Sequence, residues 1–556
     1  MVLMREIGAR RAARGLGVVA VVLVGLLAAA CEQPDWKNPE YLSKQVETGD
    51  RLRALDEIAR LDEEGKARTV PALINAYNNN TDKEKVFAVL AELRDKRAKS
   101  VYVDALKHAK SNRDRAKGAI ALGEIQATEH IPTMVDIFRN VPNEDLRRSI
   151  LEGFSAMPDA QAIPLLVEIL TTYDPDREPI AYHAYACEVL AAVDQPTDTV
   201  VKAVVFGMYL DNAKGQNVAK ECSVAVASVG KLASKELLTV AAGKHEKVNQ
   251  RFAKYSSYIE GTAEVNAIDA LGMLHDKETV AQLMELLVAR RDAPPTYRNE
   301  RLLGWGQKRN EFFVATTDAL GRIGDPAALE ALSKFVMPSD EDLESYKAII
   351  DYDKRMKLFM VEAAIKSVNA LGDRKGLEVL ATAAQKGDLP DLKGYGDDAV
   401  FQSRWQSARA FAMLGTGDDL ETWNKMVAAE KVEGMKQKFD EFRPALEAAN
   451  TCKQDAACYG KLLAGGDPLK AEKAAWELGR MERGGAAEEQ LFNGIESTSP
   501  EMRSIVIENL YRVATKKTAD KIAEVLKKEE DRATPEFKIL HVKMKGLMAY
   551  IANQGG

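Results

Sequence analysis

Apolar residues recur along the chain with the period of an α-helix. In the segment 70–77, positions i, i+3, i+4 and i+7 hold Val70, Leu73, Ile74 and Tyr77. This spacing places the four side chains on one face of a helix. The same spacing recurs in the segments 131–138, 163–170, 280–287 and 519–526. Because no run of residues alternates with period two, the pattern predicts helices and no sheet.

A second kind of helix precedes each of these, and it is rich in alanine and glycine near its end. Examples are the segments 119–125, 267–276, 315–325, 367–376, 410–419 and 474–482. Small residues let neighbouring helices approach closely. Glycine at a helix end can adopt the positive φ of a C-cap, and the aspartate that often follows can cap the next helix. The sequence therefore predicts a repeating pair of helices.

This repeating pair resembles the HEAT repeat, in the short form named after phycobilisome lyases. The resemblance implies an all-α fold, an α-α superhelix or HEAT-repeat solenoid, with about thirteen helix pairs. One pair cannot bury its own apolar stripe, whereas stacked pairs share a continuous core. We predict that the solenoid covers residues 45–530. We expect residues 531–556 to form a C-terminal helix that caps its open end, followed by a tail.

Residues 1–30 have the layout of a secretory signal peptide: an arginine-rich start, an uncharged apolar run and three alanines. Ala29, Ala30 and Cys31 resemble the lipobox of bacterial lipoproteins. The resemblance implies cleavage before Cys31, lipidation of Cys31 and a tether over residues 31–44. By the sorting rule of that family, Glu32 implies the outer membrane, with the protein facing the periplasm. Two alternatives stay open: an ordinary signal peptide with a chance cysteine, and an uncleaved N-terminal anchor.

The charge of the chain argues against nucleic-acid binding. Removing residues 1–30 takes away four arginines and one glutamate, which changes the formal net charge from −7 to −10. A general nucleic-acid binder needs a basic surface. We therefore expect the partners to be the membrane, through the N-terminal lipid, and another envelope protein.

If Cys31 carries lipid, four cysteines remain, an even number in an oxidising compartment. Cys452 and Cys458 are close enough in sequence to close a small loop by a disulfide. Cys187 and Cys222 lie about one repeat apart, at equivalent positions of successive helices, where either a disulfide or two buried thiols would fit. Neither pair has a second pair or a histidine cluster beside it, so we predict no zinc site, no other metal and no cofactor.

Three inserted loops interrupt the repeats near residues 289–310, 337–355 and 386–399. Each follows the second helix of a pair, so all three should emerge on one edge of the solenoid, where inserts often build a binding face. Arginine and aromatic residues often anchor interfaces. The candidate partner-binding residues are Arg290, Arg291, Tyr297, Arg298, Arg301, Trp305, Lys308, Arg309, Tyr346 and Tyr352. Alternatively, the basic first insert and the acidic second insert simply pack on each other.

The sequence contains no catalytic motif that we can recognise. We therefore expect a non-enzymatic interaction scaffold, held in the cell envelope by its lipid. An accessory or lyase-like binder of a small ligand is the first alternative, and buried polar side chains clustered on the concave face would favour it. A binder of polysaccharide or peptidoglycan is the second.

Overall fold

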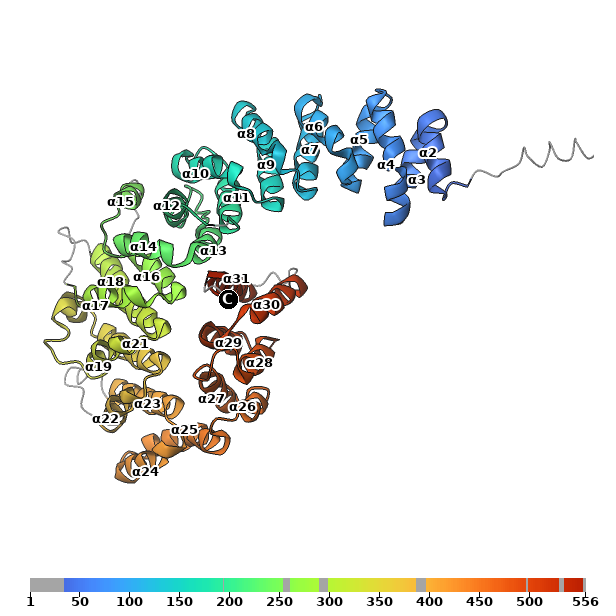
Figure 1. The fold of residues 1–556 in the computed structure, drawn as a ribbon. Helices are drawn as coiled ribbons and strands as arrows, with labels where there is room; N and C mark the ends of the chain where they lie inside the picture. The colour runs from blue at the N-terminus through green and yellow to red at the C-terminus, as the bar shows by residue number, and fades with distance from the viewer. Residues whose placement is uncertain are drawn as a thin grey trace, which may run out of the picture. The chain divides into compact units, whose positions relative to one another are not determined.

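The computed structural model describes residues 35–193, 195–253, 261–289, 299–386, 397–496, 499–529 and 535–553. This part of the chain consists of α-helices and short 3-10 helices (Figure 1), together with one isolated β-bridge between Asp211 and Asn217. The predicted all-α helical-repeat fold is confirmed. None of the described helices is both long and apolar enough to cross a bilayer. The predicted signal segment, Cys31 and the first residues of the predicted tether lie outside the described residues.

The contacts divide the chain into two compact units, which are described separately: unit 1, residues 1–162, and unit 2, residues 163–556. Unit 1 contains α2 (Pro39–Thr48), α3 (Arg51–Ile58), α4 (Glu63–Asn78), α5 (Lys83–Leu93), α6 (Lys99–His108), α7 (Asn112–Glu124), α8 (Ile131–Asn140) and α9 (Glu144–Ala156). In α4, Val70, Leu73 and Tyr77 are buried as the pattern predicts, and Ile74 is partly exposed. The apolar pattern thus predicts the buried face of α4 correctly, and Ile74 lies at the edge of that face.

Small residues bring neighbouring repeats of unit 1 together, as expected from the sequence. Where α7 packs on α9, a Cβ added at Gly123 would lie 2.4 Å from the carbonyl oxygen of Gly153. That distance is too short for any side chain. Glycine is therefore required at this position by the close approach of two backbones rather than by its own dihedral angles.

Unit 2 continues the helical repeats. Its helices are α10 (Ile163–Thr172), α11 (Ile180–Ala191), α12 (Asp198–Gly207), α13 (Ala219–Val229), α14 (Ser234–Ala241), α15 (Glu246–Ala253), α16 (Thr262–Leu274), α17 (Val280–Val288), α18 (Asn299–Ile323), α19 (Leu329–Val336), α20 (Lys347–Tyr352), α21 (Arg355–Leu371), α22 (Leu377–Gln385), α23 (Asp397–Leu414), α24 (Leu420–Ala429), α25 (Glu433–Cys452), α26 (Ala456–Leu463), α27 (Pro468–Leu478), α28 (Ala486–Asn493), α29 (Pro500–Val513), α30 (Lys516–Lys528) and α31 (Pro535–Asn553). Aspartates cap the turns between them: Asp276, Asp325 and Asp373 each accept a backbone N–H two residues ahead.

Unit 2 closes into a ring (Figure 1). The C-terminal helix α31 buries Leu540, Met544, Leu547 and Ile551 in a core shared with α29 and α30, as a cap would. It also packs against α13, near the start of the unit. The end that α31 covers is therefore not open, because curvature accumulated over the repeats brings the last helix back to an early one. As a result, the concave side of unit 2 is enclosed.

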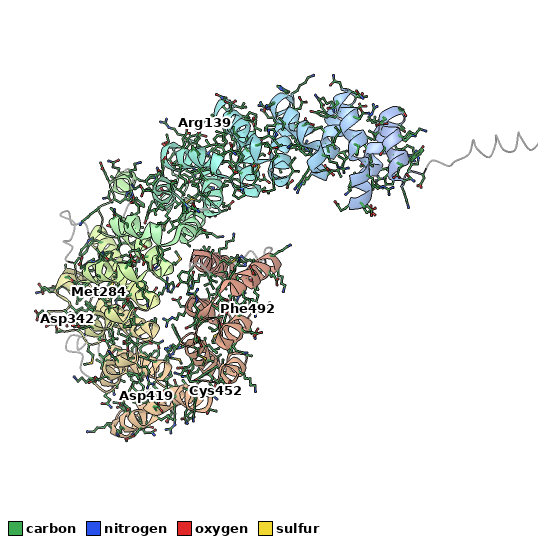
Figure 2. The ribbon with its side chains drawn as sticks, in the orientation of Figure 1. Arg139, Met284, Asp342, Asp419, Cys452 and Phe492 are labelled. Atoms are coloured by element: carbon green, nitrogen blue, oxygen red, sulfur yellow. A yellow bond between two sulfur atoms is a disulfide. The ribbon has the colours of Figure 1, made fainter. Side chains whose placement is uncertain are left out.

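The first predicted insert, near 289–310, is only partly a loop. Residues 299–310 form the first half of the long helix α18. The second insert folds into a 3-10 turn (Glu344–Tyr346) and the short helix α20. In Figure 2, Met284 of α17 and Asp342 of the second insert lie on the outer side of the ring. Most of the third insert, residues 387–396, lies outside the described residues.

Candidate functional sites of unit 2

Three of the predicted partner-binding residues belong to the core. Trp305, Arg309 and Tyr346 are 6 %, 3 % and 0 % exposed. The guanidinium of Arg309 donates to the carbonyl oxygen of Ala289 at 2.6 Å and lies 4.4 Å from the ring centroid of Tyr346. The Tyr346 hydroxyl donates to the carbonyl oxygen of Leu287. The prediction that these side chains anchor a partner is wrong, and the alternative that the two inserts pack on each other describes Arg309 and Tyr346.

The other candidates differ in their surroundings. Lys308 is partly exposed and pairs with Glu311 on the next turn of α18. Tyr352, at the end of α20, is 42 % exposed and is available to a partner. Four candidates, Arg290, Arg291, Tyr297 and Arg298, lie outside the described residues, as does the side chain of Arg301. The sequence pattern did not single out two exposed apolar neighbours of the second insert, Val288 and Phe359.

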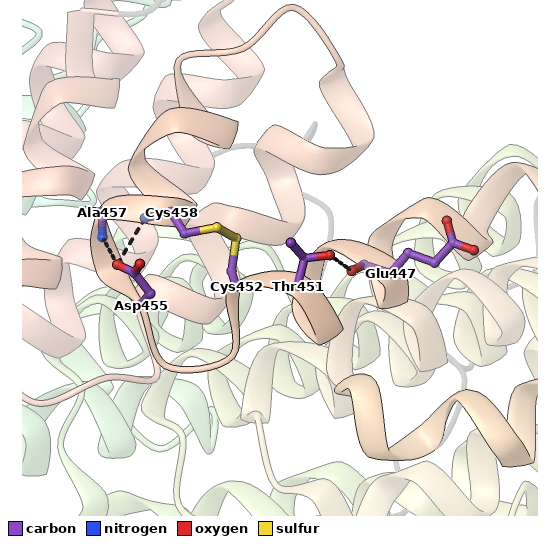
Figure 3. The surroundings of a disulfide bond; sticks show 6 residues. All are labelled: Glu447, Thr451, Cys452, Asp455, Ala457 and Cys458. Carbon is purple, nitrogen blue, oxygen red and sulfur yellow. Dashed lines mark hydrogen bonds between the residues drawn. A yellow bond between two sulfur atoms is a disulfide. The ribbon is translucent and has the colours of Figure 1, made fainter.

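Both predicted cysteine pairs form disulfides. Cys187 of α11 and Cys222 of α13 are fully buried, with 4.9 Å between their Cα atoms. Gly207 of α12 makes room for them, since a Cβ there would lie 2.7 Å from the Cys222 sulfur. Cys452 and Cys458 join the end of α25 to α26 across a turn (Figure 3). Asp455 caps α26 in that turn by accepting the backbone N–H groups of Ala457 and Cys458 at 2.9 and 3.2 Å.

One side of the ring interior is acidic. A groove of about 490 Å³ runs over α16, α18 and α21, and its lining includes Asp269, Glu311 and Asp318. Arg322, at the end of α18, pairs with Asp318 and reaches Glu508 of α29 at 3.5 Å. Desolvation by the surrounding helices, followed by the charges of Asp318 and Glu311, raises the pKa of the Asp269 carboxyl to about 6, against the opposing effect of Arg322.

We expect Asp269→Asn to stabilise unit 2 at pH 8 and to have little effect near pH 4. The folded state holds the Asp269 proton up to about pH 6, above the ordinary value of 3.8. The stability contributed by this raised pKa is therefore lost as the pH rises through 6, and asparagine removes the charge. Melting temperatures of both proteins between pH 4 and pH 8 test this. A difference that does not change with pH would contradict it.

His275 stands at the C-cap of α16 and bridges to the opposite side of the ring. Its imidazole stacks on Tyr511 of α29, with 4.6 Å between ring centroids and an interplanar angle of 19°. Burial, and then the positive charges of Arg512 and Arg322, lowers its pKa to about 3. His275 is therefore neutral at physiological pH and contributes packing rather than charge.

The opposite side of the interior is basic. Lys473 of α27 is 0 % exposed, and its ammonium group donates to the carbonyl oxygen of Met413 at 2.9 Å and to that of Gly415, at the end of α23. Glu477, one turn on, lies 2.7 Å from Lys473 and 3.1 Å from Arg480. Burial lowers the pKa of Lys473 to about 8, although Glu477 opposes the shift. The Glu477 carboxylate thus forms ion pairs with two buried cations.

Arg512, at the end of α29, joins this basic group. One of its N–H groups donates to the carbonyl oxygen of Ala370 at the end of α21. A Cβ at Gly372 would lie 3.1 Å from Nη1 of Arg512 and 3.6 Å from Nε of Arg480, so the two guanidinium groups face one small region. Both also lie beside the indole of Trp476, at 5.8 and 5.9 Å from its ring. Burial, and then Arg480, lowers the pKa of Arg512 to about 10.

Sequence reasoning missed this polar interior. A signal was present, because a Leu-Gly-Arg triplet ends two inner helices, at 320–322 and 478–480. The glycine of this triplet allows close helix packing, and the arginine that follows it supplies a charge to the interior. In the structure both arginines turn inward.

These observations define the class of the protein: a helical-repeat protein whose second unit is closed into a ring. A model of the PBS lyase HEAT-like repeat family matches residues 314–336, which span the end of α18 and α19, and this match supports repeats of the HEAT type. None of the curated proteins matches the chain.

Proposed function

We propose that this chain is a non-enzymatic interaction scaffold of the bacterial cell envelope, anchored through a lipid on Cys31, that binds another envelope protein. The observation that carries the interaction role is the HEAT-like helical-repeat fold itself. Stacked repeats offer long surfaces whose side chains vary independently of the core. We infer the residues that bind the partner from their exposure.

The proposed export rests on the signal-peptide pattern and is supported by the two disulfides. Disulfides form and persist in oxidising compartments such as the periplasm. Four cysteines outside the lipobox pair completely, as Cys187 with Cys222 and Cys452 with Cys458. Cys31 is then left for the lipid.

We place the partner surface at the insert edge, defined by Val288, Tyr352 and Phe359. These are three of the six large apolar side chains that the described part of the chain leaves exposed, at 58 %, 42 % and 46 %. Val288 ends α17, Tyr352 ends α20 within the second insert, and Phe359 lies on α21, which follows that insert. The second insert also carries several carboxylates, including Asp340, Glu344 and Asp351. An apolar centre with a charged rim suits a protein partner.

Affinity capture from detergent-solubilised envelope tests this surface. We expect Phe359→Asp and Val288→Asp each to abolish recovery of a partner that the wild-type chain recovers, because each places a charge in an apolar contact. Leu232→Asp is the matched control, since Leu232 is 60 % exposed elsewhere on unit 2. If both edge variants recover the same partners as the control, the insert edge is not the binding surface.

The lipid anchor is tested separately with a fatty-acid probe. We expect wild-type protein to take up the label and Cys31→Ala to take up none, because the thiol is the acceptor of the first acyl chains. Membrane fractionation should then release the variant. Equal labelling of the two proteins would exclude Cys31 as the attachment point.

A further inference from the structure

We propose that Arg480, Arg512 and Trp476 form a binding site for an oxyanion group, a phosphate or a carboxylate, of a small ligand that enters the ring of unit 2. The site is independent of the insert edge, which lies on the outer side. It can therefore be right or wrong regardless of whether the scaffold role holds. Three observations support it: unused donors, unbalanced charge and the convergence of the three side chains.

Buried donors at this site have no partner. Nε and Nη2 of Arg480, and the indole Nε1 of Trp476, form no hydrogen bond to any described residue, although all three atoms are shielded from solvent. The Trp476 side chain is 8 % exposed. Leaving a buried donor unsatisfied destabilises a protein substantially, so native structures rarely do it without a reason. A bound acceptor would supply that reason.

The charges at the site do not balance. Lys473, Arg480 and Arg512 carry three positive charges, and Glu477 is the one carboxylate within 4.0 Å of any of them among the described residues. The carboxylate of Glu508 pairs with Arg322. It attracts Arg512 electrostatically but forms no ion pair with it. The carboxyl ends of α21 and α23 together supply the equivalent of about one negative charge. About one positive charge remains, which a monoanionic group would neutralise.

Closing the ring does not explain these features. Between neighbouring repeats, Nη1 of Arg480 donates to the carbonyl oxygen of Met413 at 3.0 Å, and across the ring Nη2 of Arg512 donates to that of Ala370. A lysine or a neutral amide would satisfy either carbonyl. Two planar guanidinium groups that face one region near Gly372, both beside the indole ring of Trp476, suit an acceptor with several oxygens.

The ligand class follows from the donors. Arginine recognises phosphate and carboxylate through two parallel N–H groups, and the adjacent indole offers one further donor. The site borders the ring interior, because the Arg480 side chain keeps 16 % of its surface exposed although its unused donor atoms are shielded. The acidic groove at Asp269 and Asp318 lies on other helices of the same interior. It would repel a polyanion, so a small ligand with one or two acidic groups fits best.

Isothermal titration of the purified full chain in detergent tests the site, with inorganic phosphate and malonate as probes and sodium chloride at matched ionic strength. We expect at least one probe to bind in preference to chloride. Arg480→Gln and Arg512→Gln should each weaken binding by about tenfold or more, since each removes a charge-assisted contact. Arg409→Gln is the matched control, because Arg409 already pairs with Glu472 and its loss should leave the affinity unchanged.

The outcomes separate the ligand classes. If phosphate alone binds, the site recognises a phosphate group of its ligand, and if malonate alone binds, it recognises a carboxylate. If both bind, the site accepts either oxyanion. Trp476→Phe keeps an aromatic side chain but removes the indole N–H donor. This variant should therefore weaken binding even if the arginine variants prove too unstable to measure. The proposal is overturned if neither probe binds in preference to chloride, or if Trp476→Phe and every folded arginine variant bind like wild type.

Discussion

Glu477→Ala is expected to destabilise unit 2 by about 3–5 kcal/mol, the usual cost of removing one partner from a buried ion pair. The substitution leaves Lys473 and Arg480 without their shared carboxylate. Lys473 is completely buried, so water cannot replace that partner. Urea unfolding followed by tryptophan fluorescence measures the change in unit 2 directly. Four of the five tryptophans lie in this unit, so its unfolding dominates the signal.

Two further variants test the reason for this effect. Glu482→Ala removes an exposed glutamate just beyond α27 and should change the stability by less than about 0.5 kcal/mol. Lys473→Met leaves Glu477 paired with Arg480 and should cost less than Glu477→Ala. If Glu477→Ala unfolds at the same urea concentration as Glu482→Ala, the carboxylate does not hold the basic side of the ring together.

The pH dependence of this effect has a definite sign. The folded state releases the Lys473 proton near pH 8, whereas an unfolded lysine keeps it to about pH 10.4. Between these values the unfolded state binds more protons, so this group makes stability rise with pH. Removing Glu477 lowers the folded pKa further. The stability lost in Glu477→Ala should therefore shrink as the pH rises from 7 to 9.

The repeats could be predicted from the sequence because their cause is local. In α17, Val280, Leu283 and Leu287 recur with the helical period, and the same three positions are buried. Asp276 follows the end of α16 and caps the next turn. The disulfide between Cys187 and Cys222 could be anticipated for a related reason, since repeats of similar length place equivalent positions side by side.

The interior of the ring and the fate of the inserts could not be predicted, because both depend on contacts between distant residues. Arg512 donates to Ala370, which is 142 residues away in sequence, and Arg322 meets Glu508 across the ring. No short window of sequence contains either contact. Arg309 and Trp305 lie in a charged segment, which predicts exposed side chains, but both are buried, and Tyr346 of the second insert covers Arg309.

Ring closure determines which ligands can reach the inner and the outer surface of unit 2. An open solenoid would offer its concave face to a large partner, but here α31 meets α13 and the inner side chains pair across the interior. We therefore expect the proposed protein partner to bind the outer surface, where the insert edge lies, and the proposed small ligand to enter the interior.

Removing the disulfide between Cys187 and Cys222, by replacing both with alanine, is expected to destabilise unit 2 by about 4 kcal/mol in the loop-closure model. The same model gives about 2 kcal/mol for Cys452 and Cys458, because that bridge closes a much shorter loop. The sequence separations are 35 and 6 residues. Urea unfolding of the two double variants under oxidising conditions should therefore rank them in this order.

The first disulfide also has a structural consequence that the second lacks. It fixes α11 to α13, and α13 is the helix on which α31 closes the ring. Hydrogen exchange in residues 535–553 should therefore be faster without the Cys187–Cys222 bridge and unchanged without the Cys452–Cys458 bridge. Reductant should have the same effect on wild type and none on the variant that lacks Cys187 and Cys222. If fully reduced wild type exchanges in α31 as slowly as the oxidised protein, the bridge does not secure the closure of the ring.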